Sequence, residues 1–292
     1  MPDERPQVAI LGLGTMGSGM AQSLLRSEFE PDLWDRNPQR LGPFERTAGR
    51  IHESVADAVR DARVVITMVS DAAAVMELAD DKGMVDALAP GAVWAQMGTI
   101  GVRGTELAAA FTRARRPDVA FVDAPVTGSR EGAANGTLTI FASGPDAARE
   151  VTLPVFDALG SRTIWLGPAG LGSRLKLVNN TMIAFIAHGL GEAVALARHF
   201  NLTGEAVAEA FSSGMFASAY ISGKLERMAR HAYDPQFSLS LALKDVKLAL
   251  ETVDRERHPV FDSLARQWQQ AVDDGLGGED LTVITRILTE PA

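Results

Sequence analysis

A glycine-rich segment near the N-terminus constrains the fold more than any other feature of this chain. It reads Gly-x-Gly-x-x-Gly at Gly12, Gly14 and Gly17, directly after the apolar run Val8–Leu11 and directly before a helical pattern. Glycines in such a connection allow a tight turn, a close approach of the backbone to a pyrophosphate, and close packing of helix on strand. The segment predicts a dinucleotide site, with an ordinary strand-to-helix turn as the alternative. The expected cofactor contacts are Gly12, Leu13, Gly14, Thr15, Met16 and Gly17.

The second apolar run, Pro31 to Trp34, is followed by charged side chains that would select the cofactor. Asp35 lies where an acidic residue binds the adenosine ribose in such sites, and its charge would repel a 2′-phosphate. Arg36, Asn37 and Arg40 follow it and would attract a 2′-phosphate. The residues alone leave both NAD and NADP open.

The composition is that of a soluble enzyme and argues against several other classes of protein. The 292 residues are 46% hydrophobic and 22% charged, which suits a large core and two domains. A net charge of −9 offers no surface to nucleic acid, and the chain contains no cysteine for disulfides, thiolate zinc sites or a cysteine nucleophile. The first residues do not resemble a secretory signal. We therefore expect a cytoplasmic protein with no nucleic-acid or membrane partner.

Strand-like apolar runs alternate with helical patterns through the first half of the chain. Continuous apolar character predicts strands that are covered on both faces, so the expected fold class is α/β, with a doubly wound parallel sheet between helices. The last few strands are expected to depart from parallel order. The runs are Val8–Leu11, Asp32–Trp34, Val64–Val69, Ala92–Met97, Ala120–Val122, Leu138–Ala142 and Thr163–Leu166.

The pattern changes after Gly167 and Pro168, where strand signals fade and helical spacing takes over. We expect a nucleotide-binding domain over residues 1–167 and an all-helical domain over residues 168–292. The first helix, Gly172–His199, is long enough to join the two domains. Its apolar segment also carries charged and amide side chains, so a buried helix is expected rather than a membrane span. Further helices are expected over Gly204–Ser213, Ala217–Ala229, Ser240–Glu256 and Pro259–Asp273.

Two short segments follow strands at the edge where a doubly wound sheet binds its ligand. Met68, Val69 and Ser70 follow the third predicted strand, and Thr99 follows the fourth. We expect these residues to line the cofactor site. The alternatives are an ordinary helix cap at Ser70 and Asp71, and an ordinary turn at Thr99.

A small-residue segment, Thr127-Gly128-Ser129, follows the fifth predicted strand. Its hydroxyl and backbone N–H groups are suited to hold a carboxylate or an oxyanion, so these three residues are candidates for substrate binding. The alternative is a proline turn with ordinary loop hydroxyls.

Lys176 and Asn180 lie four residues apart near the head of the long helix and therefore share one face. A lysine on a helix is usually a solvated surface charge. In a helix this apolar, a partly desolvated lysine would exchange its proton more readily and serve as a proton donor and acceptor.

Together these segments resemble the β-hydroxyacid dehydrogenases, the family of 3-hydroxyisobutyrate dehydrogenase, tartronate semialdehyde reductase and glyoxylate/succinic semialdehyde reductase. The matching motifs occur in the family's order over nearly the whole chain. They are Gly12-Leu13-Gly14-Thr15-Met16-Gly17, Asp123-Ala124-Pro125-Val126-Thr127-Gly128-Ser129, Gly136-Thr137-Leu138, Lys176-Leu177-Val178-Asn179-Asn180 and Lys244-Asp245-Val246-Lys247-Leu248-Ala249.

The resemblance implies a Rossmann domain, a long interdomain helix, and a helical domain that helps to form dimers or tetramers. It implies that Lys176 is the catalytic lysine and that Asn180 holds the substrate hydroxyl. Thr127 and Gly128 would hold the substrate carboxylate, with Ser129 beside them. Thr99 would contact the nicotinamide ribose, and Lys244 would close over the cofactor and substrate.

Three departures from the family pattern bear on specificity. Thr127 and Ser129 stand where many relatives have serine and glycine, and the serine is more like the glyoxylate/succinic semialdehyde branch. Gly98 replaces a common serine beside Thr99. The related imine reductases usually lack the lysine, so Lys176 favours alcohol and aldehyde chemistry. Asp35-Arg36-Asn37-Pro38 resembles the tartronate semialdehyde reductase type and favours NAD slightly.

The sequence therefore predicts an NAD(P)-dependent oxidoreductase that interconverts a small 3-hydroxy acid and its semialdehyde. Reduction of an imine or a bulky carbonyl on the same scaffold is one alternative. A non-catalytic NAD(P)-binding protein is another. No metal is expected, because His188 and Glu192 have a ligand-like spacing but no third ligand.

Overall fold

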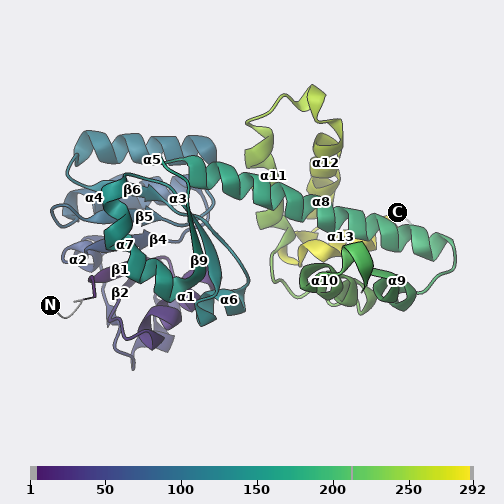
Figure 1. The fold of residues 1–292 in the computed structure, drawn as a ribbon, viewed down its shortest axis with the longest axis horizontal. Helices are drawn as coiled ribbons and strands as arrows, with labels where there is room; N and C mark the ends of the chain where they lie inside the picture. The colour runs from purple at the N-terminus through teal and green to yellow at the C-terminus, as the bar shows by residue number, and fades with distance from the viewer. Residues whose placement is uncertain (1–4, 212, 290–292) are drawn as a thin grey trace. The chain divides into compact units, whose positions relative to one another are not determined.

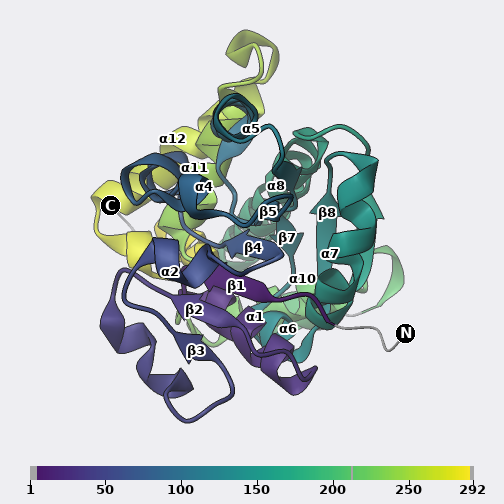
Figure 2. The same cartoon turned by 90° about the vertical axis from the view of Figure 1, so that its left-hand side faces the viewer.

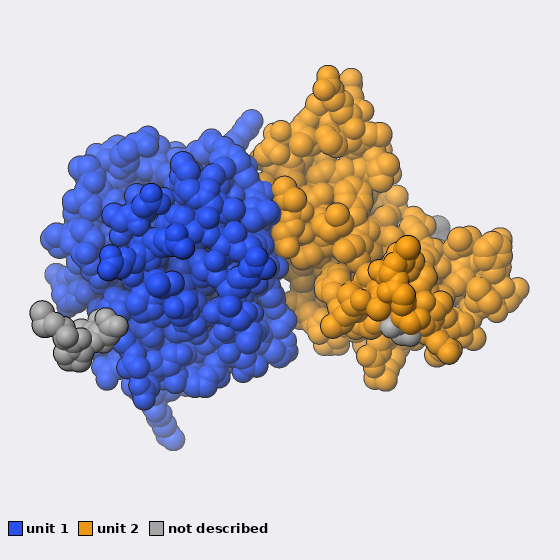
Figure 3. Space-filling model, viewed as in Figure 1, with its two compact units in different colours: residues 1–176 blue, residues 177–292 orange. Residues whose placement is uncertain are grey.

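The computed structural model of the protein describes residues 5–211 and 213–289. The chain divides into two compact units, residues 1–176 and residues 177–292 (Figure 3). Helix α8 (Leu171–His199) begins in the first unit and ends in the second.

Six parallel strands form the main sheet of the first unit, with helices on both of its faces (Figure 1). Their order is β3-β2-β1-β4-β5-β6, which is the strand order of the Rossmann fold. The predicted doubly wound parallel sheet is thereby confirmed. The strands are β1 (Val8–Leu11), β2 (Asp32–Trp34), β3 (Arg50–Ile51), β4 (Val64–Thr67), β5 (Val93–Gln96) and β6 (Ala120–Asp123).

Alternate residues along the strands enter two separate cores, one on each face of the sheet. Figure 2 shows the helices that cover these two faces. Ile10 and Ile66 pack with α1 (Thr15–Arg26) and α7 (Asp146–Leu159). Leu11 and Val65 pack into the opposite core. This burial on both faces explains the continuous apolar runs. The helices of the opposite face are α2 (Val55–Val59), α3 (Ala72–Met76), α4 (Met84–Ala87) and α5 (Gly101–Arg115), and the shorter turns of this unit are η1 (Pro38–Arg40), η2 (Gly42–Phe44) and η3 (Glu77–Asp81).

Glycines bring separate segments of main chain together at the carboxyl ends of the strands. Gly12 has φ +101°, and a Cβ placed there would lie 2.6 Å from the carbonyl oxygen of Met68. A Cβ on Gly17 would lie 1.9 Å from the carbonyl oxygen of Gly12, so α1 packs directly on the preceding turn. Gly12 thus makes the tight turn, and Gly17 the close packing of helix on the preceding segment, that the motif predicts.

A smaller sheet follows the main sheet and departs from parallel order, as expected. Strand β7 (Val126–Thr127) pairs antiparallel with β8 (Leu138–Ala142), which pairs parallel with β9 (Gly160–Trp165). The short connection between β7 and β8 suits an antiparallel pair, because parallel strands need a longer crossover. It contains α6 (Arg130–Asn135), which packs against α1.

The differences between predicted and observed elements have local causes. Strands β3 and β7 contain two residues each, too few to give an apolar pattern. The helix predicted over Ser240–Glu256 ends early, as α11 (Leu239–Leu250), where the hydroxyl of Thr252 donates to the carbonyl of Ala249. Of the helix predicted over Gly204–Ser213, the structure shows α9 (Gly204–Phe211), and residue 212 lies outside the described residues.

The described residues of the second unit form helices and turns, with no strand among them. Helices α8, α9 and α10 (Ala219–Ala229) share a core that includes Leu190, Val207 and Leu225. Helix α8 is long and apolar enough to cross a membrane by length and composition, a test that the core helix of a soluble protein also passes. The remaining elements are α11, α12 (Pro259–Asp273), α13 (Ile284–Thr289), η4 (Gly214–Phe216), η5 (Arg255–Arg257), η6 (Leu276–Gly278) and η7 (Leu281–Val283).

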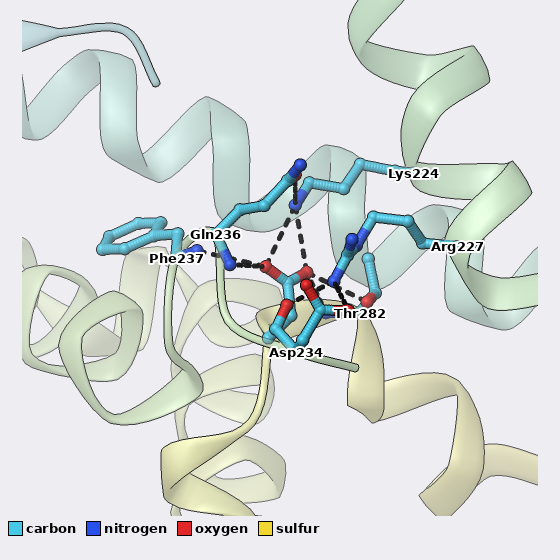
Figure 4. A network of polar contacts seen from close by, with 7 residues as sticks. Lys224, Arg227, Asp234, Gln236, Phe237 and Thr282 are labelled. Atoms are coloured by element: carbon cyan, nitrogen blue, oxygen red, sulfur yellow. Dashed lines mark hydrogen bonds and ion pairs between the residues drawn. The ribbon is translucent and has the colours of Figure 1, made fainter. Parts of the chain in front are cut away.

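A buried ion pair joins α10 to the C-terminal segment of this unit (Figure 4). The ammonium of Lys224 lies 3.0 Å from Oδ1 of Asp280. Oδ1 also accepts the backbone N–H of Thr282, and Oδ2 accepts those of Gln236 and Phe237. Burial alone would raise the pKa of Asp280, but the charge of Lys224 and these hydrogen bonds outweigh it and hold the pKa below its usual value. The carboxylate is therefore satisfied as an anion.

We expect Gly12→Ala to lower the free energy of unfolding of the protein by about 1–3 kcal/mol, because alanine must adopt a positive φ and its methyl group meets the Met68 carbonyl. Gly42→Ala is the control in the same unit, since a Cβ on Gly42 meets nothing within 4 Å. Chemical denaturation of both variants measures the difference. Equal stabilities would contradict the close approach.

We expect Lys224→Met to lower the free energy of unfolding by about 3–5 kcal/mol, because it leaves the Asp280 carboxylate buried without its cation.

The ion pair between Lys224 and Asp280 also makes the stability of the protein depend on pH. The pKa of Asp280 is lower in the folded than in the unfolded chain, so its stabilising effect is complete above the usual pKa near 3.8 and is lost as the pH falls further. Denaturation midpoints of the wild type and the variant between pH 2 and pH 7 measure both effects. A loss of unfolding free energy below about 1 kcal/mol in Lys224→Met would contradict the expected effect of the ion pair.

Candidate active site

The first unit brings the predicted cofactor residues other than Lys244, which lies in the second unit, to one edge of its main sheet. Backbone bonds run from the N–H of Met68 to the carbonyl of Leu11 and from the N–H of Met97 to the carbonyl of Thr67. The glycine-rich loop and the segments after β4 and β5 are therefore neighbours at the carboxyl ends of the strands. Ligands bind at this edge in doubly wound sheets.

A cavity of about 290 Å³ lies beside the glycine-rich loop and the first turns of α1. The helix N-terminus offers backbone N–H groups, and two arginines, Arg40 and Arg130, add positive charge. This donor set fits the phosphates of a dinucleotide. The sequence analysis did not identify Arg130, although this residue directly follows Ser129, which was predicted to bind substrate. The cavity is lined by Leu13, Gly14, Thr15, Ser18, Gly19, Gln22, Arg40, Arg130 and Ala134.

Asp35 is held inward against the glycine-rich loop. Its Oδ2 accepts the backbone N–H of Leu13 at 2.6 Å, and its Oδ1 accepts that of Asn37 at 2.7 Å. The side chain of Arg40 lies 3.5 Å from Oδ2, and Asp35 as a whole is only 6% exposed. The carboxylate therefore fixes the shape of the loop, and its charge is partly offset by Arg40.

The residues after Asp35 are directed toward solvent. The side chain of Arg36 is 78% exposed and lies 3.8 Å from the carboxylate of Glu77. The side chain of Asn37 accepts the backbone N–H of Gln39 and caps η1. Arg36 and Arg40 thus place two guanidinium groups after β2, at the strand end where the adenosine ribose binds in this fold.

The segments after β4 and β5 combine the predicted position with ordinary structural roles. Ser70 donates to Asp71, and Asp71 caps α3 by accepting the N–H of Ala74, which is the alternative noted from the sequence. The amide of Gln96 bonds both the N–H and the carbonyl of Gly98. A Cβ on Gly98 would lie 2.4 Å from the carbonyl oxygen of Val69, which explains the glycine at this position. Thr99 follows, half-buried.

The candidate carboxylate-binding segment forms the connection from β7 to α6. Gly128 has φ +143°, and a Cβ there would lie 2.7 Å from the side chain of Leu138. Ser129 caps α6 by accepting the N–H of Gly132 at 3.0 Å. Its hydroxyl proton is not used in that bond. Thr127 is half-buried in β7, opposite Thr139.

Lys176 lies in the second turn of α8 and is only 9% exposed. The position therefore has the burial that the proton-transfer hypothesis requires.

Asn180, Lys244 and Asp245 form a polar cluster in the second unit. Asn180 Nδ2 donates to Asp245 Oδ2 at 2.5 Å, and Asn179 donates to Asn180 Oδ1. Asp245 Oδ1 lies 3.0 Å from the ammonium of Lys244. The amide of Asn180 is thereby oriented, with a second N–H on Nδ2. The sequence analysis did not single out Asp245, although it stands beside Lys244 in a quoted motif.

His188 and Glu192 form a pair on α8, with 3.6 Å between Nε2 and Oε1. Burial lowers the pKa of His188, and Glu192 only partly opposes the shift. Within residues 5–211 and 213–289, no three His, Cys, Asp or Glu residues come together as metal ligands.

Comparison with known proteins identifies both halves of the chain. Residues 7–167 match the family described as the NAD-binding domain of 6-phosphogluconate dehydrogenase. Residues 170–288 match the family described as NAD-binding of NADP-dependent 3-hydroxyisobutyrate dehydrogenase.

Several relatives are similar over almost their full length. The chain is 30% identical to NAD-dependent L-serine dehydrogenase of Pseudomonas aeruginosa, covering 96% of this chain and 97% of that protein. It is 29% identical to glyoxylate/succinic semialdehyde reductase 1 of Arabidopsis thaliana, covering 95% and 96%. The crystal structure of 3-hydroxyisobutyrate dehydrogenase from Salmonella typhimurium is 25% identical, with a TM-score of 0.85 over 96% and 99% of the two chains. The chain thus belongs to the β-hydroxyacid dehydrogenase family and is an NAD(P)-dependent oxidoreductase.

Proposed function

We propose that the protein interconverts a small 3-hydroxy acid and its semialdehyde by direct hydride transfer, with Lys176 as proton donor and acceptor. The observation that carries this proposal is the burial of Lys176 in α8, on the same helix face as Asn180. A lysine at a solvated surface position would not support it. A buried lysine on the face that carries Asn180 can serve as a general acid and base toward a bound substrate.

Lys176 and Asn180 have separate roles in the proposed oxidation of an alcohol. The nicotinamide cofactor, when bound, accepts the hydride from the carbon that carries the hydroxyl group. Lys176 in its neutral form takes the hydroxyl proton, and the second N–H of Asn180 Nδ2, beside the one bonded to Asp245, donates to the same oxygen. In the reverse direction, protonated Lys176 returns the proton to the aldehyde oxygen as the carbon receives hydride.

We propose that Thr127, Gly128 and Ser129 hold the carboxylate of the substrate. Thr127 and Ser129 contribute hydroxyl groups, and Gly128 adds a backbone N–H at a position where the chain admits no side chain. The threonine methyl narrows this segment relative to serine and favours small acids. Relatives named for L-serine and for glyoxylate or succinic semialdehyde support the same class.

We propose NADP as the preferred cofactor. The sequence favoured NAD slightly because Asp35-Arg36-Asn37-Pro38 resembles the tartronate semialdehyde reductase type, but both oxygens of the Asp35 carboxylate accept backbone N–H groups and Arg40 lies beside it. These hydrogen bonds and the neighbouring guanidinium reduce the repulsion between this carboxylate and a 2′-phosphate. Arg36 and Arg40 supply cations for that phosphate.

Lys176→Ala should lower kcat by about 10²–10⁴-fold, the usual contribution of a positioned acid or base, while cofactor affinity is retained. The assay follows NAD(P)H absorbance with 3-hydroxyisobutyrate, serine, glycerate, 4-hydroxybutyrate and the corresponding aldehydes. Lys247→Ala is the control, since this lysine is exposed on α11. Turnover of amine and ketone mixtures alone would favour imine reduction. Cofactor binding without any turnover would favour the non-catalytic alternative.

Arg36→Ala should weaken NADP binding by roughly tenfold, because it removes a charged partner of the 2′-phosphate, and should leave NAD binding nearly unchanged. Arg40→Ala should weaken the binding of both cofactors, because Arg40 also lines the cavity for the shared phosphates, but that of NADP more. Fluorescence titration with NADPH and NADH measures both affinities. Arg60→Ala is the control, since Arg60 pairs with Asp57 on the same unit away from the loop. An unchanged NADPH-to-NADH ratio in both variants would overturn the NADP proposal.

A further inference from the structure

The head of helix α8 is tied to the end of β6 by a buried aspartate, Asp123. Its Oδ2 accepts the backbone N–H of Ser173 at 2.7 Å, and its Oδ1 accepts the hydroxyl of Ser173 at 2.6 Å. Asp123 is 0% exposed and Ser173 is 3% exposed. A carboxylate in contact with the first-turn N–H groups also suits the positive end of the helix dipole.

The main chain of α8 lies directly on the two sheets at this point. A Cβ on Gly172 would lie 2.2 Å from the carbonyl oxygen of Phe141 and 2.7 Å from that of Asp123. The N–H of Gly172 donates to the hydroxyl of Ser143, which itself donates to Asp123. The first turn of the helix is thus fixed both by close packing and by hydrogen bonds, all within the first unit.

The hydroxyl of Ser173 also extends the network to α5. Ser173 Oγ lies 2.8 Å from Thr105 Oγ1, and Thr105 donates to the carbonyl of Gly101. Ser173 thus contacts both Asp123 and Thr105. Burial raises the pKa of Asp123, and the bonds from Ser173 and Ser143 oppose the rise.

Lys176 follows Ser173 by three residues, so it lies one helical turn beyond the anchored residue, on nearly the same side. Any tilt or fraying of the first turn moves its ammonium group. We propose that Asp123, acting through Ser173, is the positioning residue that holds Lys176 in place for proton transfer. This inference rests on the proposed role of Lys176 itself.

The test compares variants that remove or preserve the anchor. Asp123→Ala removes both acceptors, and we expect kcat to fall by about 10–100-fold while the affinity for NADPH stays within about threefold. Asp123→Asn keeps an acceptor for the Ser173 N–H and can donate an N–H to the Ser173 hydroxyl oxygen, so both links to Ser173 remain. We expect it to retain kcat within about threefold. Ser173→Ala keeps the backbone bond and should lie between the two, and it serves if Asp123→Ala does not fold.

Asp280→Ala is the control for a purely structural effect. Asp280 is also 0% exposed and heavily hydrogen-bonded, but it lies outside the proposed site. It should lower the free energy of unfolding while kcat per folded molecule is unchanged. Equal losses of kcat in Asp280→Ala and Asp123→Ala would overturn the positioning role.

The decisive measurement is kcat of Asp123→Ala in the Lys176→Ala background. If Asp123 acts through Lys176, the double variant has the same residual activity as Lys176→Ala alone. An additional loss equal to that in the wild-type background, or a wild-type kcat for both Asp123→Ala and Ser173→Ala, would overturn the inference. Full activity of Lys176→Ala would instead overturn the proposed function, which keeps the two failures distinct.

Discussion

Contacts between main chains that leave no room for a side chain hold the carboxyl edge of the main sheet together. A Cβ on Gly12 would meet the carbonyl of Met68, one on Gly98 would meet that of Val69, and one on Gly172 would meet that of Phe141. These contacts join the glycine-rich loop, the segments after β4 and β5, and the head of α8. The cofactor loop and the helix that carries Lys176 therefore depend on the same kind of packing, which only glycine permits.

The sequence predicted the strands of the main sheet well because burial on both faces leaves a direct signal. Val8–Leu11 consists only of apolar residues, and each of them is buried in one of the two cores. The exposed strand β3 and the two-residue strand β7 carry no such signal. Their existence depends on pairing with a neighbour, which is a tertiary contact. The early end of α11 likewise depends on a local bond of Thr252 rather than on apolar spacing.

The site could be predicted only in part, because sequence spacing shows position but not orientation. The positions of the glycine-rich loop and of Asp35 at strand ends follow from motif and topology. The direction of the Asp35 carboxylate does not, because it depends on the N–H groups of Leu13 and Asn37. Arg130 lines the cavity because α6 packs on α1, and Asp245 bonds Asn180 from another helix. Neither contact can be predicted from the spacing of residues within one helix, because each joins residues of two different elements.

The proposed chemistry needs Lys176 and Asn180 at a constant separation, and the helix alone supplies it. Residues four apart on one helix face have their Cβ atoms about 5–6 Å from each other. The three residues between them, Leu177, Val178 and Asn179, include neither proline nor glycine, the usual causes of a kink. Lys176 belongs to the unit that holds the cofactor cavity, and Asn180 to the unit that holds Asp245. The helical backbone between these two residues therefore sets the distance between the proposed proton-transferring group and the proposed hydroxyl-binding group.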